Sequence, residues 1–270
     1  MSFSKSKMED FFLEDPKNNH IEKELNSTVM KYFYFNDELK LKTKSREILN
    51  GCLLLGDVVL NYNNSDIDLN QFDIFFIPPN KEITLKITSK TDTNHKICIN
   101  SYQINEDIDL KFEIQRFDLK KFIPRGDHGS KEKMATYRTV WTAIKNRYFM
   151  SGYTNIPNES LKQGVITSVN LVENNEGKIE IYPHIHPAYP EVYIMCIDDD
   201  NYAITQYLIN TEGKSTCKDL KDGDGLFFPG VLGHSNIARP FYKNLKYCMY
   251  YWCIPTFGNI ELVNPITMKV

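Results

Sequence analysis

The sequence lacks the features that would place the protein in a membrane, outside the cell or on a nucleic acid. No stretch of the 270 residues approaches the ~20 consecutive apolar residues of a membrane span. The start, MSFSKSKMEDFF, has no apolar core of a signal peptide. Lys and Arg number 32 against 35 Asp and Glu, and a net charge of -3 argues against a phosphate-backbone partner. We therefore expect a cytoplasmic protein with a small-molecule partner, and with neither nucleic acid nor membrane.

Several catalytic motifs are also missing. The six cysteines form no CxxC pair, which excludes a zinc ribbon or a thioredoxin-like redox motif. Cys248 and Cys253 stand in an apolar aromatic run, where a free cysteine behaves as a small core residue. No Gly-rich phosphate loop and no Gly-x-Ser-x-Gly elbow are present. Nucleotide and serine-hydrolase chemistry therefore have no support in the sequence.

What the sequence does contain is a series of short runs rich in Ile, Val, Tyr and Phe, separated by Asn, Asp, Gly and Pro. This pattern is typical of an all-β sandwich or barrel. The strands that it predicts cover residues 51–60, 72–77, 83–87, 110–115, 165–172, 178–182, 192–197, 203–208, 225–228 and 246–254. Long amphipathic helices are scarce, and the best candidate covers residues 134–147.

The charged segment around residues 124–147 divides the chain into two β halves of similar size, and the halves share a motif. A shift of 151 residues aligns Asp73–Pro78 with Asp224–Pro229: an aspartate, an apolar aromatic strand and a proline. Ile83 and His234 stand five residues after the two prolines. The alignment predicts two copies of one β fold, of which only the second carries polar chemistry.

That chemistry is concentrated in a histidine motif of the second half. His184 and His186 are two residues apart, so a strand would present both imidazoles on one face. Glu191 is out of phase with them on a continuous strand, but Pro187 and Pro190 allow the chain to turn and restart with Glu191 facing inward. His234 follows a Pro-Gly turn on another strand. Together they predict four ligands for one metal ion.

Three histidines and one carboxylate suit a divalent ion with positions open to water or substrate, because structural zinc sites more often use cysteine and are closed. The alternative interpretation makes His184 and His186 exposed strand residues and His234 an unrelated turn residue. The combination of a paired motif, a glutamate and a distant histidine favours the metal site.

These residues also carry a resemblance to a known family. The pattern H-x-H-x4-E, followed by G-x5-P-x4-H from Gly223 to His234, resembles the two metal-binding motifs of the cupin superfamily. More closely, the chain is similar to 5-keto-4-deoxyuronate isomerases and, more distantly, to 5-deoxy-glucuronate isomerases. Gly230 directly follows Pro229, whereas the general cupin pattern has its glycine one place later.

The resemblance implies two double-stranded β-helix (cupin jelly-roll) barrels in tandem, joined by a short helical linker. The implied domains are an N-terminal barrel without metal ligands at residues 1–124, a linker at 125–150 and a metal-binding barrel at 151–270. It also implies a homo-oligomer and an isomerase that converts an aldose into a ketose on a uronic-acid-derived sugar. The cofactor would be one divalent metal per chain, zinc first, with manganese, iron or nickel as alternatives.

In such an enzyme an ion would stabilise the charge of an enediolate while a base moves a proton between adjacent carbons. The base is a metal-bound hydroxide, a tyrosine such as Tyr193, or Glu191 released from the metal; the sequence leaves these open. Arg239 is the candidate partner for a substrate carboxylate, against the alternative of a surface arginine. Tyr182 and Tyr250 are further candidates for substrate binding. A metal-dependent dioxygenase and a non-catalytic sugar-binding cupin remain as alternative functions.

Overall fold

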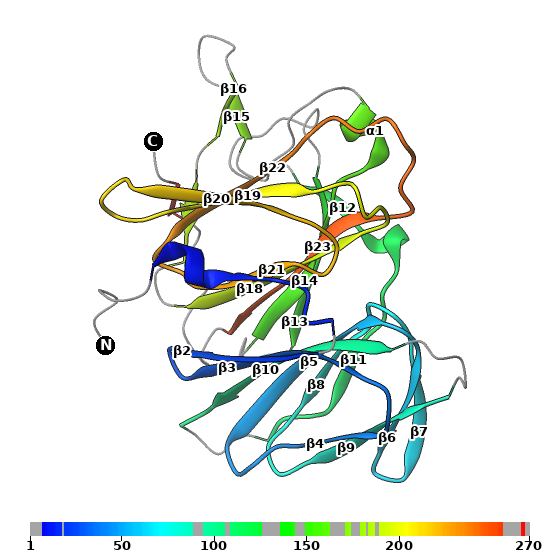
Figure 1. Cartoon of the computed structure of the whole chain (residues 1–270). Helices are drawn as coiled ribbons and strands as arrows, with labels where there is room; N and C mark the ends of the chain where they lie inside the picture. The colour runs from blue at the N-terminus through cyan, green and yellow to red at the C-terminus, as the bar shows by residue number, and fades with distance from the viewer. Residues whose placement is uncertain are drawn as a thin grey trace.

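A computed structural model shows a protein built almost wholly of antiparallel strands (Figure 1). The structure describes residues 7–17, 19–88, 94–105, 109–125, 136–143, 149–162, 171–173, 179–181, 183–186, 189–255 and 266–267. Within these ranges the helical elements are short: η2 (Met8–Phe11), η3 (Leu119–Lys121) and α1 (Asn158–Lys162). No helix there has the length and apolar character needed to span a membrane.

Two sheets enclose the core of the first half. The six-stranded sheet has the order β11 (Glu113–Gln115), β8 (Ile74–Ile77), β5 (Glu47–Leu55), β10 (His95–Gln103), β3 (Thr28–Phe35) and β2 (His20–Leu25). The four-stranded sheet has the order β4 (Leu39–Lys42), β9 (Glu82–Ile87), β6 (Val58–Tyr62) and β7 (Ser65–Leu69). Apolar residues of both sheets, such as Phe75 and Leu60, form one buried cluster between them. This is the first barrel.

The second barrel is built in the same way. Its seven-stranded sheet has the order β1 (Phe12–Leu13), β21 (Gly225–Pro229), β18 (Pro190–Ile197), β23 (Cys248–Pro255), β14 (Phe149–Asn155), β13 (Thr136–Ala143) and β12 (Ile123–Arg125). Its five-stranded sheet has the order β20 (Ser215–Leu220), β19 (Ile204–Ile209), β22 (Gly233–Ala238), β17 (His184–Ile185) and β24 (Ile266–Thr267). A separate pair joins β15 (Leu171–Glu173) and β16 (Ile179–Ile181). A second buried cluster lies between the two larger sheets of this barrel.

The strand order confirms the repeat that the sequence predicts. In the first barrel β8, β5, β10 and β3 are consecutive neighbours, and β21, β18, β23 and β14 follow the same order in the second. The smaller sheets match as well, since β4, β9, β6 and β7 correspond to β17, β22, β19 and β20. The aligned motifs after Asp73 and Asp224 therefore occupy equivalent strands, β8 and β21. The chain has the expected all-β fold of two barrels in tandem.

The two barrels pack together through the outer faces of their larger sheets (Figure 1). Along β18, Ile194 contributes to the cluster between the barrels and Tyr193 to the core of the second barrel. The strand is thus buried on both faces, which explains why its sequence is almost continuously apolar rather than alternating. Five cysteines are buried and free, as their apolar surroundings predict, and Cys217 is exposed.

The helix expected at residues 134–147 is wrong where the structure describes this segment. Residues 136–143 form strand β13, which pairs with β14 from Tyr137↔Asn155 to Ala143↔Phe149. Thr, Val, Tyr and Trp dominate the strand TYRTVWTA, and these β-branched and aromatic residues favour an extended chain. The helical interpretation rested on spacing alone, and strand pairing with β14 overrides it.

Two smaller differences concern strand bounds. The single strand expected at residues 51–60 is interrupted, because Gly56 adopts a positive φ of 85° and separates β5 from β6. Most of the strand expected at residues 165–172 lies outside the described residues.

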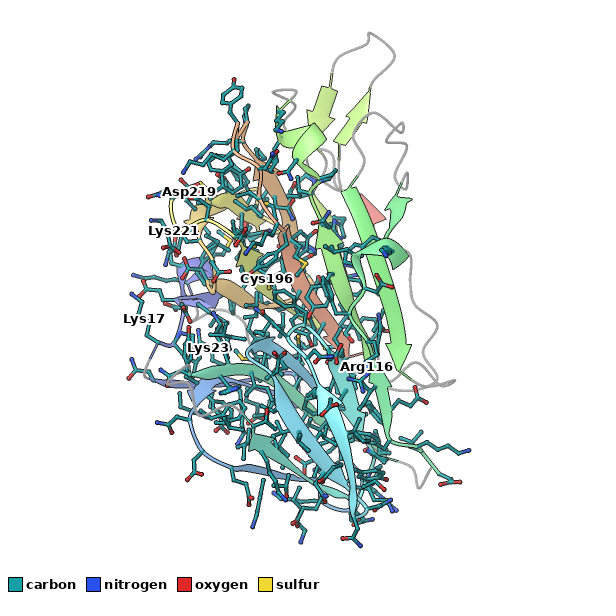
Figure 2. All side chains as sticks on the ribbon, turned by 90° about the vertical axis from the view of Figure 1, so that its right-hand side faces the viewer. Lys17, Lys23, Arg116, Cys196, Asp219 and Lys221 are labelled. Atoms are coloured by element: carbon teal, nitrogen blue, oxygen red, sulfur yellow. The ribbon has the colours of Figure 1, made fainter. Side chains whose placement is uncertain are left out.

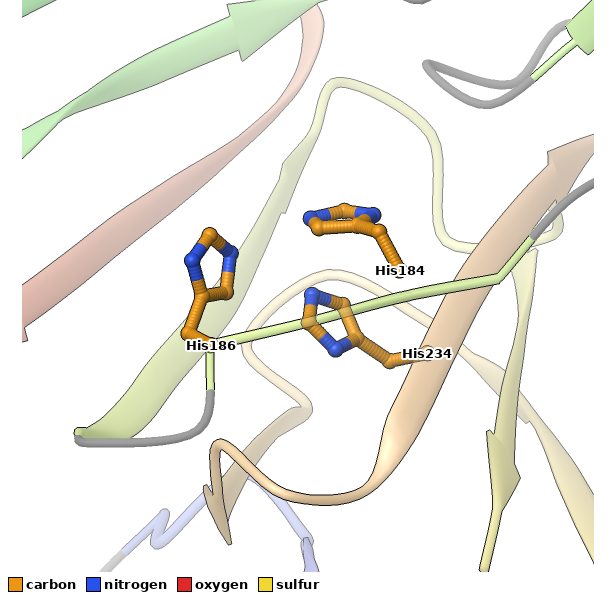
Figure 3. Close-up of side chains that lie close together, drawn as sticks. All are labelled: His184, His186 and His234. Carbon is orange, nitrogen blue, oxygen red and sulfur yellow. The ribbon is translucent and has the colours of Figure 1, made fainter. Parts of the chain in front are cut away.

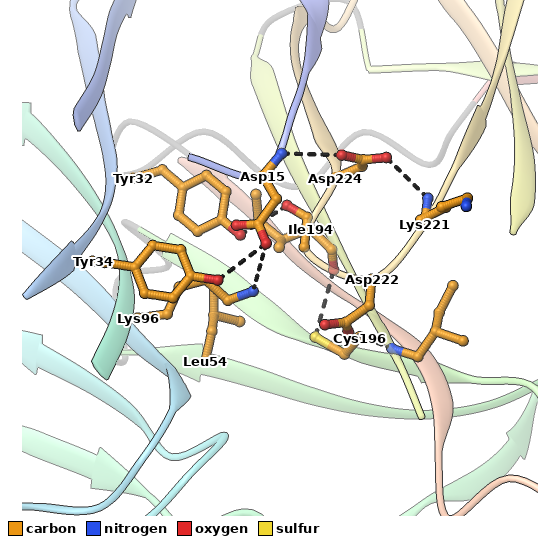
Figure 4. Close-up of polar contacts among 12 residues, drawn as sticks. Asp15, Tyr32, Tyr34, Leu54, Lys96, Ile194, Cys196, Lys221, Asp222 and Asp224 are labelled. Carbon is orange, nitrogen blue, oxygen red and sulfur yellow. Dashed lines mark hydrogen bonds and ion pairs between the residues drawn. The ribbon is translucent and has the colours of Figure 1, made fainter. Parts of the chain in front are cut away.

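The N-terminal segment connects the two barrels (Figure 4). Its strand β1 pairs with β21 of the second barrel, and Asp15 lies 3.6 Å from the buried ammonium of Lys96 on β10 of the first. Tyr34 also donates a hydrogen bond to Asp15, at 3.0 Å. The strands β1 and β12 thus belong to a sheet of the second barrel, and the division at residues 1–124, 125–150 and 151–270 stays a prediction.

Candidate metal centre

Three histidines meet inside the second barrel (Figure 3). His184 on β17 and His234 on β22 are directly opposed cross-strand partners, and their ring centroids are 4.1 Å apart. His186 follows β17, and its ring centroid is 4.9 Å from that of His184. One nitrogen of each ring lies within 4.8 Å of the others, and all three side chains are buried. Among the described residues this is the group whose geometry suits a metal ion.

The fourth predicted ligand comes from the opposite sheet. Strand β18 restarts at Pro190, so Glu191 faces the barrel interior together with Tyr193. Its Oε2 lies 3.2 Å from Nε2 of His234 and 3.5 Å from Nε2 of His186. Only 2% of Glu191 is exposed, so this is a carboxylate without access to bulk water. The structure therefore brings all four predicted ligands to one place.

These distances fit residues that share one ion. Ligand atoms bound at about 2.1 Å to a tetrahedral or octahedral ion stand about 3.0–3.5 Å from one another. The Oε2 atom of Glu191 is fully buried, and the imidazole nitrogens of His186 and His234 face it. A buried acceptor of this kind is costly unless a cation satisfies it. The donor set of three imidazoles and one carboxylate suits zinc, manganese, iron or nickel and leaves positions for substrate.

The charge of Glu191 is set by its neighbours. Burial alone would raise the pKa of the Glu191 carboxyl, but His186, His234 and a hydrogen bond from Tyr193 outweigh it and hold the pKa below its ordinary value. Glu191 is thus ionised near neutral pH, which is the form that a metal ligand requires.

The turn around Gly230 holds one of the predicted ligands, His186. In the sequence this glycine stands out as part of a Pro-Gly turn and as a departure from the cupin pattern. The backbone N–H of His186 donates to the carbonyl of Gly230 at 2.7 Å. A Cβ atom at Gly230 would stand 1.9 Å from the carbonyl oxygen of His186 and 2.0 Å from that of Tyr189. Only glycine permits this approach, and the Pro-Gly dipeptide after the strand was the available signal.

Aromatic side chains surround the ligands. The ring of Tyr193 lies 5.8 Å from that of His234 and 4.9 Å from that of Tyr250, and both tyrosines are buried. Phe228 lies 4.8 Å from His234. Tyr250 is thus one ring further from the ligands than Tyr193. Tyr182, the other tyrosine predicted to bind substrate, lies outside the described residues.

Arg239 is not brought to the metal centre, so its predicted contact with a substrate carboxylate needs correction. It follows the end of β22, five residues and about 17 Å of extended chain beyond His234. Its guanidinium forms two hydrogen bonds with Asp219, and both side chains are more than half exposed. Asp219 lies on the outer surface of the second barrel (Figure 2). The short spacing along the sequence suggested that Arg239 lies near His234, but an extended strand separates the two residues in space.

The first barrel has apolar residues at the equivalent positions. His184 and His234 are cross-strand partners in the second barrel, and Leu41 and Ile83 are the corresponding pair in the first. Glu191 opposes Phe228, whereas Leu49 opposes Ile77. Leu49 and Ile83 belong to the apolar core of the first barrel, and the partly buried Leu41 packs against it. Polar chemistry at these positions is thus confined to the second copy.

Among the comparisons with known proteins, the one with solved structures identifies the fold. No family model matches the sequence, and no curated protein does. Among solved structures, AerE from Microcystis aeruginosa superposes with a TM-score of 0.55 and 13% identity, covering 91% of this chain and 98% of that one. An IolB-like protein from Salmonella typhimurium has a TM-score of 0.54 and 11% identity, over 94% of each chain.

The oxalate decarboxylase of Lactobacillus farciminis is similar to the same degree, with a TM-score of 0.54 and 10% identity over 99% of this chain and 88% of that one. At such low identity the likeness shows the fold alone, which is that of tandem cupin barrels. The buried histidine triad is consistent with metal binding in that fold.

Proposed function

We propose that the protein is a metal-dependent sugar isomerase, which interconverts aldose and ketose forms of a uronic-acid-derived sugar such as 5-keto-4-deoxyuronate. The observation that carries the proposal is the buried cluster of His184, His186, His234 and Glu191 inside the second barrel. These four residues would hold one divalent ion, zinc by preference. When bound, the ion supplies Lewis-acid stabilisation of the negative charge that develops on an enediolate.

The chain's own groups suit the proton transfer that such a reaction requires. Tyr193 hydrogen-bonds to the Glu191 carboxylate, so a phenol and a carboxylate stand together beside the histidines. We infer that this pair holds and moves the proton between the two carbons. Phe228 and Tyr250 exclude water from the same space, which strengthens each electrostatic interaction there.

A uronate substrate also needs a group that holds its carboxylate. Arg239 lies outside the site, and among the described residues buried in the second barrel there is no lysine or arginine. A substrate carboxylate would therefore be held by other groups. The IolB-like structure and the oxalate decarboxylases share the fold, and the resemblance of the ligand motifs to uronate isomerases favours the sugar acid.

A metal-dependent dioxygenase is the second candidate, because the same ligands can hold iron and activate oxygen. The decisive experiment combines metal analysis of the purified protein with an assay on 5-keto-4-deoxyuronate, with and without oxygen. An isomerase converts the sugar equally in both conditions, whereas a dioxygenase needs oxygen and a binding protein shows no turnover.

The ligand assignment is tested in the same preparation. His186→Ala removes one of four ligands and should lower the metal content sharply, whereas His20→Ala changes an exposed histidine of the first barrel and should leave it intact. Equal metal content in both variants would show that the cluster is not the metal site.

A further inference from the structure

Two amides interrupt the apolar lining of the second barrel near the histidines. Gln206 on β19 is fully buried, and Asn236 on β22 is 2% exposed. They are directly opposed in the pairing of the two strands. Their neighbours on the same face, Ile204, Leu208 and Ala238, all belong to the barrel's apolar core. The two amides thus form a polar pair inside the barrel.

This polar pair is adjacent to the metal centre. His234 precedes Asn236 by two residues on β22, and its cross-strand partner Leu208 follows Gln206 by two residues on β19. Residues two apart on a strand share a face and are separated by about 7 Å. Gln206 and Asn236 therefore lie on the same wall of the barrel as His234, one step along the strand.

The amide of Gln206 has a fixed orientation. Its Nε2 donates to the backbone carbonyl of Ser235 at 2.8 Å and to that of Tyr207 at 3.2 Å. Both partners are backbone carbonyl oxygens, which only accept hydrogen bonds. The amide atom that faces them is therefore the nitrogen. The remaining atom, Oε1, is buried and has no hydrogen-bond partner in the structure. Buried polar atoms without partners are rare in native proteins, and each calls for an explanation.

We propose that Oε1 of Gln206 binds a hydroxyl group of the substrate, at a carbon several bonds away from the oxygens that face the histidines. An amide oxygen accepts hydrogen bonds and repels a carboxylate, so it recognises a hydroxyl and not the acid end of the molecule. The separation of about 7 Å between the two steps of the strand exceeds the length of a two-carbon acid. The site is therefore built for a polyhydroxylated chain, and the inference rests on the proposed function while deepening it.

The test compares two acids that have the same 2-hydroxycarboxylate end and different lengths. Glycolate has two carbons, and gluconate extends the same end by four carbons that carry hydroxyl groups. Their dissociation constants with the zinc-loaded protein are measured by calorimetry, which needs no turnover. Gln206→Leu removes the acceptor, and Gln206→Asn withdraws it by one methylene group.

Thr205→Val is the matched control, because Thr205 is adjacent on β19, faces away from the barrel interior and binds Asp219. Zinc content and circular dichroism establish that each variant is folded and loaded. The native protein should bind gluconate more tightly than glycolate. Gln206→Leu should weaken the binding of gluconate about tenfold, the effect of one lost hydrogen bond, and leave the affinity for glycolate unchanged.

Gln206→Asn should also weaken the binding of gluconate, and it takes the place of Gln206→Leu if that variant fails to fold. Thr205→Val should change the affinity for neither acid. An equal affinity for gluconate in native protein and Gln206 variants would overturn the role of Gln206, and so would an equal loss for both acids. If neither acid binds the zinc-loaded native protein, the proposed function fails together with this inference.

Discussion

A metal ion and protons compete for the same atoms of Glu191 and its histidine neighbours. His186 and His234 hold the pKa of Glu191 below its ordinary value in spite of its burial, so the carboxylate stays charged in mildly acidic solution. Protons on the imidazoles, and not on the carboxylate, are therefore the competitors that a metal must displace.

The sign of the pH dependence follows from this competition. An imidazole binds a metal only when neutral, and a free histidine has a pKa of about 6.5. Metal affinity should therefore be full above that range and should fall at least about tenfold between pH 7.5 and pH 5.5. Calorimetric titration with zinc at the two pH values measures it. An affinity that does not change over this interval would exclude the histidines as ligands.

At the scale of elements, the turn between β21 and β22 positions the loop that carries His186. Gly230 accepts the backbone hydrogen bond of His186, and any Cβ there would overlap the carbonyl oxygens of His186 and Tyr189. Gly230→Ala should push this loop away from His234. We expect a loss of about 10–100-fold in metal affinity, as for other groups that support a ligand. The loss of unfolding free energy should be about 1–3 kcal/mol.

A glycine in the turn between β19 and β20 supplies the control for this prediction. Gly213 has a positive φ of 77°, but a Cβ there would meet no atom within 4 Å. Gly213→Ala should therefore cost some stability through backbone strain and leave the zinc affinity unchanged. Similar zinc affinities in the two variants would show that the Gly230 contact does not position His186.

At the scale of the whole molecule, the barrels are joined by polar contacts as well as by apolar ones. Asn50 on β5 is fully buried between the larger sheets, where its Nδ2 donates to Ser151 at 3.2 Å. Its Oδ1 accepts hydrogen bonds from Tyr251 at 2.8 Å and from Cys253 at 3.5 Å. One side chain of the first barrel thus pairs with two strands of the second. Contacts of this kind favour one relative placement of the barrels, because any shift leaves them unpaired.

Removing this side chain tests how much the polar contacts contribute. Asn50→Leu keeps the branched shape of the side chain and leaves Ser151 and the Tyr251 hydroxyl without this partner, so the free energy of unfolding should fall by about 2–4 kcal/mol. Denaturation by guanidinium measures the loss, with the exposed Asn36→Leu as the control. A change below about 0.5 kcal/mol, the usual effect of a surface substitution, would mean that the polar contacts of Asn50 do not help to join the barrels.

The amino-acid sequence by itself determined the β character of the chain, the repeat and the ligand motif. Each is visible in short patterns of the sequence: alternating and apolar runs define strands, and His184-x-His186 sets two imidazoles on one face. The recurrence of the Asp73 motif at Asp224 predicted two barrels because equivalent strands need similar residues at similar spacing. Local pattern was sufficient for these features.

Only the tertiary structure decided which residues of different strands lie close together. Residues 136–143 became a strand because β14 lies beside them, although their spacing also suited a helix. Arg239 is close to His234 in the sequence and distant in space, because a strand advances about 3.4 Å per residue. Glu191 meets the histidines because two sheets face each other across one barrel. The distance between its carboxylate and the imidazoles depends on how the sheets pack, which no short stretch of sequence determines.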